Sequence, residues 1–145
     1  MNPNSQMAET ALTRQTAQPL VFDEGLESPM AAAILEAMSD EFSRIILNCL
    51  VESGKSIEDI ASQNGIPVST TYRRIHEMCH RGLVIVERIA VTKSGKSQAI
   101  YRSTFRGARI DVELGGVRVV GLPNDGIPDI TFRLWQFSER QSVIQ

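Results

Sequence analysis

The sequence predicts an α+β protein in which four helices are followed by two β-hairpins and a C-terminal helix. Three observations support this prediction. Apolar residues recur at helical spacing from residue 28 to residue 82. Runs rich in valine and isoleucine then flank two turns that contain glycine. The positive charge of the chain is concentrated in residues 67–109, across the last predicted helix of the four and the first hairpin.

The N-terminal part of the chain divides at residue 28. Residues 1–27 are polar and lack periodicity, so we expect a disordered or loosely ordered tail. Ser28 and Pro29 then have the form of an N-cap and a proline at the first helical position. One side of the helix that begins there would be lined by Met30, Ile34 and Met38. The sequence leaves open whether this helix packs on its own domain or forms part of a dimer interface.

A second helix is expected to begin at Ser39, with Asp40 and Glu41 near the positive end of its dipole. Its apolar stripe has the spacing i, i+3, i+4, i+7, i+8 and consists of Phe42, Ile45, Ile46, Cys49 and Leu50. This pattern predicts the core helix of the domain. Because Cys49 lies on the stripe, we interpret it as a small buried hydrophobe and not as a reactive thiol.

Residues 56–84 predict two short helices joined by a tight turn. Ser56, with an acidic residue three positions later, has the spacing of a capping box, and Gly65 is expected to end this first helix in a left-handed step. The second helix is predicted to begin near Pro67 and to run to Gly82. Its inward stripe would consist of Thr71, Ile75, Met78 and Gly82.

The opposite face of this second helix is polar and, in its first turns, rich in hydrogen-bonding groups. At 100° per residue it is formed by Ser69, Thr70, Arg73, His76, Glu77 and His80, with Tyr72 and Arg74 on the flanks. Where such a helix pair binds DNA, the first residues of the second helix meet base edges in the major groove, which suits hydroxyls, a guanidinium and an aromatic ring. The alternative is an ordinary solvated helix face.

The distribution of charge bears on this choice. The net charge of the 145 residues is −2, which by itself does not suggest a nucleic-acid-binding protein. However, residues 1–66 carry −7, residues 67–109 carry +7 and residues 110–145 carry −2. The positive block coincides with the second helix and the hairpin after it, as expected of a phosphate-binding face.

The first hairpin is predicted from two β-prone runs, residues 83–92 and 99–105, around the polar turn KSGKSQ. The basic residues available to touch phosphates or a minor groove beside the helix are Arg88, Lys93, Lys96 and Arg102. Lysines at a hairpin tip also keep a protein soluble and protect a strand edge. The hairpin therefore supports DNA binding only in combination with the helix.

Residues 107–122 predict a second hairpin, because apolar and charged residues alternate up to a Gly-Gly turn. It could extend the sheet of the first hairpin, build a partner surface or wall a ligand pocket. Residues 129–145 also alternate like a strand, but we interpret them as a helix whose tryptophan and phenylalanines pack on the domain or on a second subunit. We thus expect a DNA-binding domain at 28–106 and a candidate dimerisation extension at 107–145.

The order of these elements resembles a winged helix-turn-helix domain, and it most resembles the ArsR-like regulators of archaea. The likeness covers residues 39–105 and is most specific over residues 65–84, with the run STTYRRI followed by Gly-Leu-Val. It implies a DNA-binding transcription regulator, often dimeric, with base-reading positions at Ser69, Thr70, Tyr72 and Arg73. Metal-sensing members carry a cysteine pair on the first helix of the motif, which residues 56–62 lack, so metal sensing is not carried over.

We therefore interpret the chain as a winged helix-turn-helix regulator that binds specific double-stranded DNA as a cytoplasmic homodimer, with no membrane association. The expected DNA contacts are Ser69, Thr70, Tyr72, Arg73, Arg74, His76, Lys93, Lys96 and Arg102. The alternative is a protein–protein interaction adaptor within a larger assembly. A small effector bound between the second hairpin and the C-terminal tail is compatible with DNA binding, although no residue identifies it.

Other kinds of chemistry are not indicated by the sequence. His76, Cys79 and His80 have the spacing to share a transition metal, but no fourth ligand suggests itself, so we expect neither metal nor cofactor. There is no glycine-rich nucleotide loop, catalytic carboxylate pair or nucleophile beside a base, which predicts that the chain is not an enzyme. Two distant cysteines, no secretory signal and no apolar run of about 18 residues predict a reducing, intracellular setting.

Overall fold

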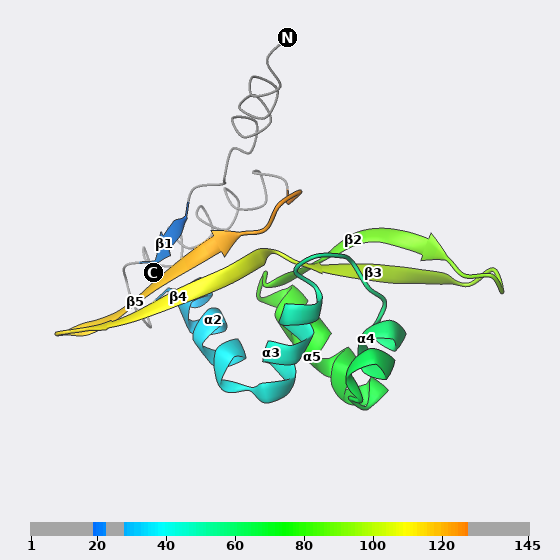
Figure 1. Cartoon of the computed structure of the whole chain (residues 1–145), viewed down its shortest axis with the longest axis horizontal. Helices are drawn as coiled ribbons and strands as arrows, with labels where there is room; N and C mark the ends of the chain where they lie inside the picture. Colours follow the sequence, from blue (N-terminus) through cyan, green and yellow to red (C-terminus); the bar gives the residue numbers. More distant parts are fainter. Residues whose placement is uncertain (1–18, 23–27, 128–145) are drawn as a thin grey trace, which may run out of the picture.

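The computed structural model of the chain describes residues 19–22 and 28–127, and the statements below concern these residues. Within them the class is α+β, as predicted, with helices that precede two hairpins (Figure 1). The helices are α2 (Pro29–Ser39), α3 (Glu41–Cys49), α4 (Ile57–Asn64) and α5 (Val68–His80), and the strands are β1 (Leu20–Phe22), β2 (Val84–Val91), β3 (Ser97–Ser103), β4 (Phe105–Glu113) and β5 (Gly116–Pro123). The predicted C-terminal helix lies outside the described residues.

The first two helices begin at side-chain caps. The Ser28 hydroxyl accepts a hydrogen bond from the Ala31 N–H at 3.3 Å, and a proline follows the cap as predicted. Asp40 ends α2 and caps α3, where its carboxylate accepts from both the N–H and the hydroxyl of Ser43. This bonding turns Ser43 inward. Phe42, which was predicted on the apolar stripe of α3, is instead exposed.

The hydrophobic core lies where the helices meet the inner ends of the strands. The largest fully buried apolar side chains come from α3, the C-cap of α3, α4, α5, β2 and β5: Ile46, Leu50, Ile60, Ile75, Val84 and Val119. On α5 the predicted inward residues Thr71, Ile75 and Met78 are buried, which fixes the rotation of this helix about its axis. Burial of a large aliphatic side chain is worth about 1.5–3 kcal/mol, so the rotation is strongly determined.

The tight turn between α4 and α5 agrees closely with the sequence prediction. The Ser56 hydroxyl caps α4 by accepting the Asp59 N–H at 3.1 Å, and Gly65 ends the helix with φ +64°. Pro67 is the N-cap of α5 and not its first helical residue, and the helix ends at His80, two residues before the predicted end. The α4 and α5 helices pack against each other.

Both predicted hairpins are present, but they belong to separate sheets. Strands β2 and β3 pair in one sheet, whereas β1, β5 and β4 form another in that order. The two hairpins extend in opposite directions above the helices (Figure 1). The option that the second hairpin extends the first sheet is therefore wrong. The chain passes from one sheet to the other at Thr104, between β3 and β4. There the Thr104 N–H donates to the Leu83 carbonyl, and the Thr104 carbonyl accepts from the Asn124 N–H.

The N-terminal tail prediction is wrong for Leu20–Phe22. These residues form β1, which pairs antiparallel with β5 from Leu20 opposite Gly121 to Phe22 opposite Val119. Three residues are too few to show periodicity, and the strand exists because an edge of β5, distant in sequence, supplies its hydrogen bonds. The other residues of the predicted tail lie outside the described residues.

Candidate nucleic-acid interface

The exposed side of α5 brings together the residues that the sequence predicted to read bases. We define the recognition face as Ser69, Thr70, Tyr72, Arg73 and His76. Thr70 is half-buried and the other four are exposed. The rings of Tyr72 and His76, one helical turn apart, lie with their centroids 4.2 Å from each other and tilted by 34°. The face thus combines hydroxyls, a guanidinium and a pair of stacked rings.

The N-terminus of α5 adds backbone donors to this face. The N-cap residue, Pro67, forms no side-chain capping hydrogen bond, unlike the caps of α2, α3 and α4. In any α-helix the first N–H groups have no partner within the helix, and the helix dipole favours negative charge there. This end of α5 therefore suits a phosphate oxygen or a base acceptor better than a capped end would.

Arg74, which was predicted as a DNA contact, is paired with carboxylates within the protein. Its guanidinium lies 2.8 Å from the Asp40 carboxylate and 3.4 Å from that of Glu77, and the side chain is only 25% exposed. Burial raises the pKa of Asp40, but the two Ser43 hydrogen bonds and the charges of Arg74 and Arg44 outweigh it and lower the pKa below its usual value. Arg74 therefore holds α5 against the start of α3 and does not point outward.

The β2–β3 hairpin, called the wing below, places Arg88, Lys93 and Lys96 on its exposed surface. Arg102 differs from its prediction: its side chain is 16% exposed, donates from Nε to the Val51 carbonyl at 3.1 Å, and pairs with Glu87 at 3.1 Å. It secures the base of the wing to the end of α3.

A second connection fixes the wing to the helix-turn-helix. The backbone groups of Lys55 and Tyr101 exchange two hydrogen bonds, of 3.0 and 2.8 Å, so the loop after α3 pairs with β3. The orientation of the wing relative to α5 is therefore determined by backbone bonds as well as by side chains. No sequence pattern indicated this pairing.

The nine basic residues of the positive block divide into two groups. Four pair with carboxylates: Arg74, Arg81, Arg102 and Arg109. The other five form no ion pair within the described part of the chain: Arg73, Arg88, Lys93, Lys96 and Arg106. Of these five, four belong to α5 or the wing, so the unpaired positive charge is concentrated on these two elements.

The His76, Cys79 and His80 group does not assemble a metal site in the structure. Both histidines are exposed, whereas Cys79 is half-buried and its burial raises the pKa of the thiol to about 11. A protonated thiol is a poor metal ligand. Across residues 19–22 and 28–127, no three His, Cys, Asp or Glu side chains gather closely enough to hold a metal ion.

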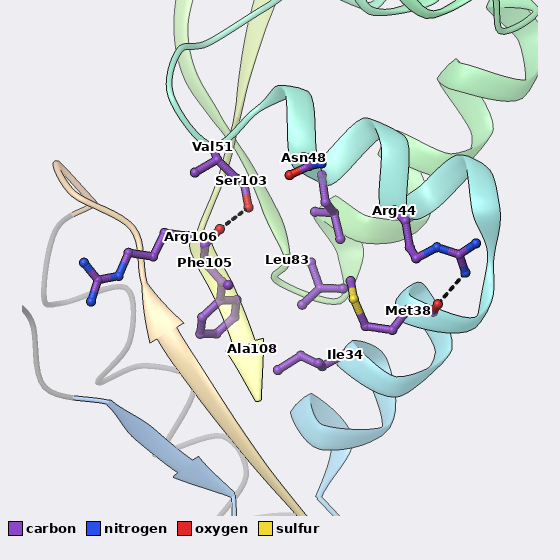
Figure 2. Close-up of a pocket in the computed structure, with 12 residues that line it drawn as sticks. Ile34, Met38, Arg44, Asn48, Val51, Leu83, Ser103, Phe105, Arg106 and Ala108 are labelled. Atoms are coloured by element: carbon purple, nitrogen blue, oxygen red, sulfur yellow. Dashed lines mark hydrogen bonds between the residues drawn. The ribbon is translucent and has the colours of Figure 1, made fainter. Parts of the chain in front are cut away.

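The second hairpin forms one wall of a half-open cavity of about 260 Å³, opposite α2 and α3 (Figure 2). Its apolar wall includes Ile34, Met38, Leu47, Val51, Leu83 and Phe105. The guanidinium of Arg44 donates to the Met38 carbonyl at 2.6 Å and, like that of Arg106, is directed away from the cavity in Figure 2. Of the roles predicted for this hairpin, forming a pocket wall is thus compatible with the structure. The C-terminal tail, on the other side of the predicted effector site, lies outside the described residues.

A membrane-spanning helix is not found in the described ranges, because none of their helices combines the length and the hydropathy needed to cross a bilayer.

Comparison with known proteins finds a likeness among solved structures only. No family model matches the chain, and no curated protein does. Among solved structures, the chain is similar to a homodimeric winged helix-turn-helix DNA-binding domain from Mycobacterium bovis, described as a possible ArsR-family transcriptional regulator. The sequences are 16% identical, the likeness covers 79% of each chain, and the TM-score is 0.41. A likeness of this degree says nothing about function.

The fold itself follows from the geometry described above. Helices α4 and α5 meet at the Gly65 turn, α5 is followed directly by the wing, and the wing is bound to the loop before α4. The chain is an α+β protein with a winged helix-turn-helix arrangement and an additional β-hairpin.

Proposed function

We propose that this protein is a transcription regulator that binds specific sequences of double-stranded DNA. The observation that carries this proposal is that α5 exposes the recognition face and that the wing, which directly follows α5 and contacts it, exposes unpaired cations. Helix α5 would enter the major groove, where Ser69, Thr70 and Arg73 meet base edges. Tyr72 and His76 would add apolar and hydrogen-bonding contacts. Lys93 and Lys96 would bind backbone phosphates beside the groove.

The paired arginines support this proposal from within the protein. Arg74 binds Asp40 of the α3 cap, and Arg81 binds Glu36 of α2, so α5 is held at its middle and at its C-terminal end. A recognition element must be held rigidly, because base readout depends on hydrogen-bond geometry. Arg74 and Arg102, which the sequence placed among the DNA contacts, serve here to position α5 and the wing.

The proposal includes the finer assignments made from the sequence. Binding as a homodimer would allow a pseudo-palindromic site with half-sites about 34 Å apart to be read. The resemblance to ArsR-like regulators of archaea, the cytoplasmic location and the absence of catalysis belong to the same proposal. Occupancy of a promoter would block or recruit the transcription machinery.

The proposal is tested by binding of the full chain to labelled genomic duplex fragments across a salt series, with random-sequence competitor. We expect a steep loss of affinity with salt and a subset of fragments that resist competitor. Steep salt dependence with no resistant fragments would contradict sequence specificity. Absence of binding at low salt would contradict DNA binding itself.

The adaptor alternative is favoured by a different observation. Val112 and Leu114 of the second hairpin are largely exposed, and apolar side chains grouped at a surface often mark a protein contact. If the chain fails to bind duplex DNA at low salt, the positive face becomes a docking surface for an acidic protein, and the adaptor proposal replaces the first.

A further inference from the structure

The outer edge of β4 is the most prominent unused surface of the second sheet. The sheet has the order β1-β5-β4, so among the described strands β4 has a neighbour on one side only. It is nine residues long, and such an edge presents a row of backbone donors and acceptors to any strand that approaches. Proteins usually shorten, cover or bulge long edges of this kind.

One face of β4 carries apolar side chains beyond the limit of the core. Ile110 and Val112 lie on this face of the strand and Leu114 follows in the turn; Val112 is 84% exposed and Leu114 is fully exposed. Val119, which lies opposite Ile110 on β5, is completely buried. Toward the hairpin tip the sheet extends beyond the core, and its apolar side chains are exposed to solvent there. A second strand paired with β4 would cover part of this exposed apolar surface.

The other face of β4 carries charges of both signs: Arg109 is positive, and Asp111 and Glu113, which follow it on the same face, are negative. Arg109 pairs with Asp111 along the strand at 3.1 Å, and Glu113 lies 3.9 Å from Arg118 on β5. Edges that resist pairing usually carry charges of one sign, most often lysine. A positive and a negative residue two positions apart, such as Arg109 and Asp111, can instead complement a copy of themselves that runs in the opposite direction.

We propose that two copies of this chain pair antiparallel along β4, with Ile110 on the two-fold axis. Arg109 then lies opposite Asp111 of the partner subunit, and Asp111 lies opposite Arg109 of the partner subunit. On the apolar face Val112 lies opposite Ala108 of the partner subunit. The two Arg109–Asp111 pairs join opposite charges, and the apolar side chains of Ile110 and Val112 continue across both copies, so that the two sheets form one.

Other registers are less favourable. A shift that places Asp111 on the axis brings two carboxylates opposite each other, and one that places Arg109 there brings two guanidinium groups together, both of which destabilise a strand pair. A shift of one residue places Ile110 opposite a charged residue and mixes the two faces. Charge complementarity therefore selects the register centred on Ile110.

The pairing leaves the recognition face accessible. The second hairpin extends away from the wing, and α4 and α5 lie under the wing end of the molecule (Figure 1). The dimer would carry one recognition face at each end. The pairing uses only the strand edge and its charges, so it does not depend on DNA binding.

The test uses two single variants of the full chain, Arg109→Asp and Asp111→Arg. Both side chains are at least 37% exposed, so the fold should be retained. Analytical ultracentrifugation at tens of micromolar should show a dimer for the unaltered chain. Each variant alone should raise the dimer Kd about tenfold or more, because two attractive pairs become repulsive. An equimolar mixture of the two variants should form a heterodimer, visible by native mass spectrometry, because every pair across the edge is then of opposite sign.

The behaviour of the Asp111→Arg variant alone separates this register from the one with Asp111 on the axis. With Asp111 on the axis, the Asp111→Arg variant alone would keep the attraction between Arg109 and Glu113 of the partner subunit and would remain dimeric. That result, a monomeric unaltered chain, or failure of the mixture to pair would each overturn the proposal.

Two further variants complete the design. Val112→Lys should also weaken the dimer, since it places a charge on the shared apolar face without touching the core. Val91→Lys changes a similarly exposed valine of the wing and should leave the dimer Kd unchanged. Equal effects of these two variants would contradict the assignment to β4. The monomeric variants should still bind a DNA half-site, so failure of this proposal and of DNA binding are distinguishable.

Discussion

The wing and the second hairpin are built from similar local sequence and differ in their charges. Both are antiparallel pairs of β-prone residues around a glycine turn, and both expose valine side chains. Residues 84–103 contain four basic residues and one acidic residue, whereas residues 105–123 contain three basic and two acidic. The wing is therefore suited to a polyanion, and the second hairpin to a surface with both signs. Backbone architecture alone does not distinguish these two uses.

The largest expected effect arises where the two hairpins meet. Asn124 is buried, and its amide donates to the carbonyls of Val51 and Ser103 at 2.8 and 2.9 Å. Because these bonds are formed away from water, Asn124→Ala should lower the free energy of unfolding by about 2–3 kcal/mol. Urea denaturation measures this change. Asn48→Ala, at an exposed position of α3, is the control and should have little effect. Equal losses of stability for both variants would contradict a specific contribution from the Asn124 hydrogen bonds.

The next largest effect is on DNA affinity, and it compares a cation of α5 with a cation of the second hairpin. Arg73→Ala should weaken binding to a specific site by about 1–3 kcal/mol if the guanidinium contacts a guanine, with less loss on random duplex. Arg106→Ala removes the same charge from an exposed, unpaired position of β4 and should leave both affinities nearly unchanged. Fluorescence anisotropy with labelled duplexes measures the four constants. Similar losses for both variants would indicate a nonspecific charge effect.

A smaller effect concerns the tip of the wing. Lys93→Gln and Lys96→Gln should each weaken binding to all duplexes alike. Each should also reduce the slope of log K against log salt by about 0.9 for every phosphate that the lysine neutralises. A salt titration of each variant measures the slope. An unchanged slope would show that the wing does not touch the DNA backbone.

The smallest expected effect is a pH dependence of the stability that Asp40 contributes at the junction of α2 and α3. The pKa of Asp40 is lowered in the folded protein, so its ionised form contributes stability above the unfolded pKa of about 4. This contribution is lost as the pH falls through the folded pKa. The stability difference between the unaltered chain and Asp40→Asn should therefore shrink between about pH 5 and pH 2. Thermal unfolding midpoints in this range measure it, and a constant difference would contradict the assignment.

Much of the fold was predictable because its signals are local. The cap at Ser28, the cap at Ser56 and the left-handed end at Gly65 each depend on residues within four positions, and all three are confirmed. The inward face of α5 followed from helical periodicity alone. The first hairpin followed from two β-prone runs around a glycine turn, and the second from alternation around a Gly-Gly turn.

The features that the sequence did not indicate share a different cause, which is a partner distant in sequence. Arg74 and Arg102 look like surface cations, but Asp40 lies 34 residues and the Val51 carbonyl 51 residues away from them. Strand β1 depends on β5, and no pattern in a run of three residues reveals that pairing. The recognition face was predictable as a set of outward residues. Tertiary contacts, however, determine which basic residues are paired with carboxylates, and these contacts cannot be read from local sequence.

One residue joins the two hairpins, and its bonding has a consequence for motion. The Thr104 N–H donates to the Leu83 carbonyl, and the Thr104 carbonyl accepts from the Asn124 N–H. The Thr104 hydroxyl lies within hydrogen-bonding distance of the Gly82 and Leu83 carbonyls. A rotation of one hairpin against the other would have to break these bonds together. Slow hydrogen exchange is therefore expected at the Thr104 amide, which would open only when the whole domain unfolds. The wing and the second hairpin are therefore expected to move as one rigid body, so that a displacement of the tip of one hairpin also displaces the tip of the other.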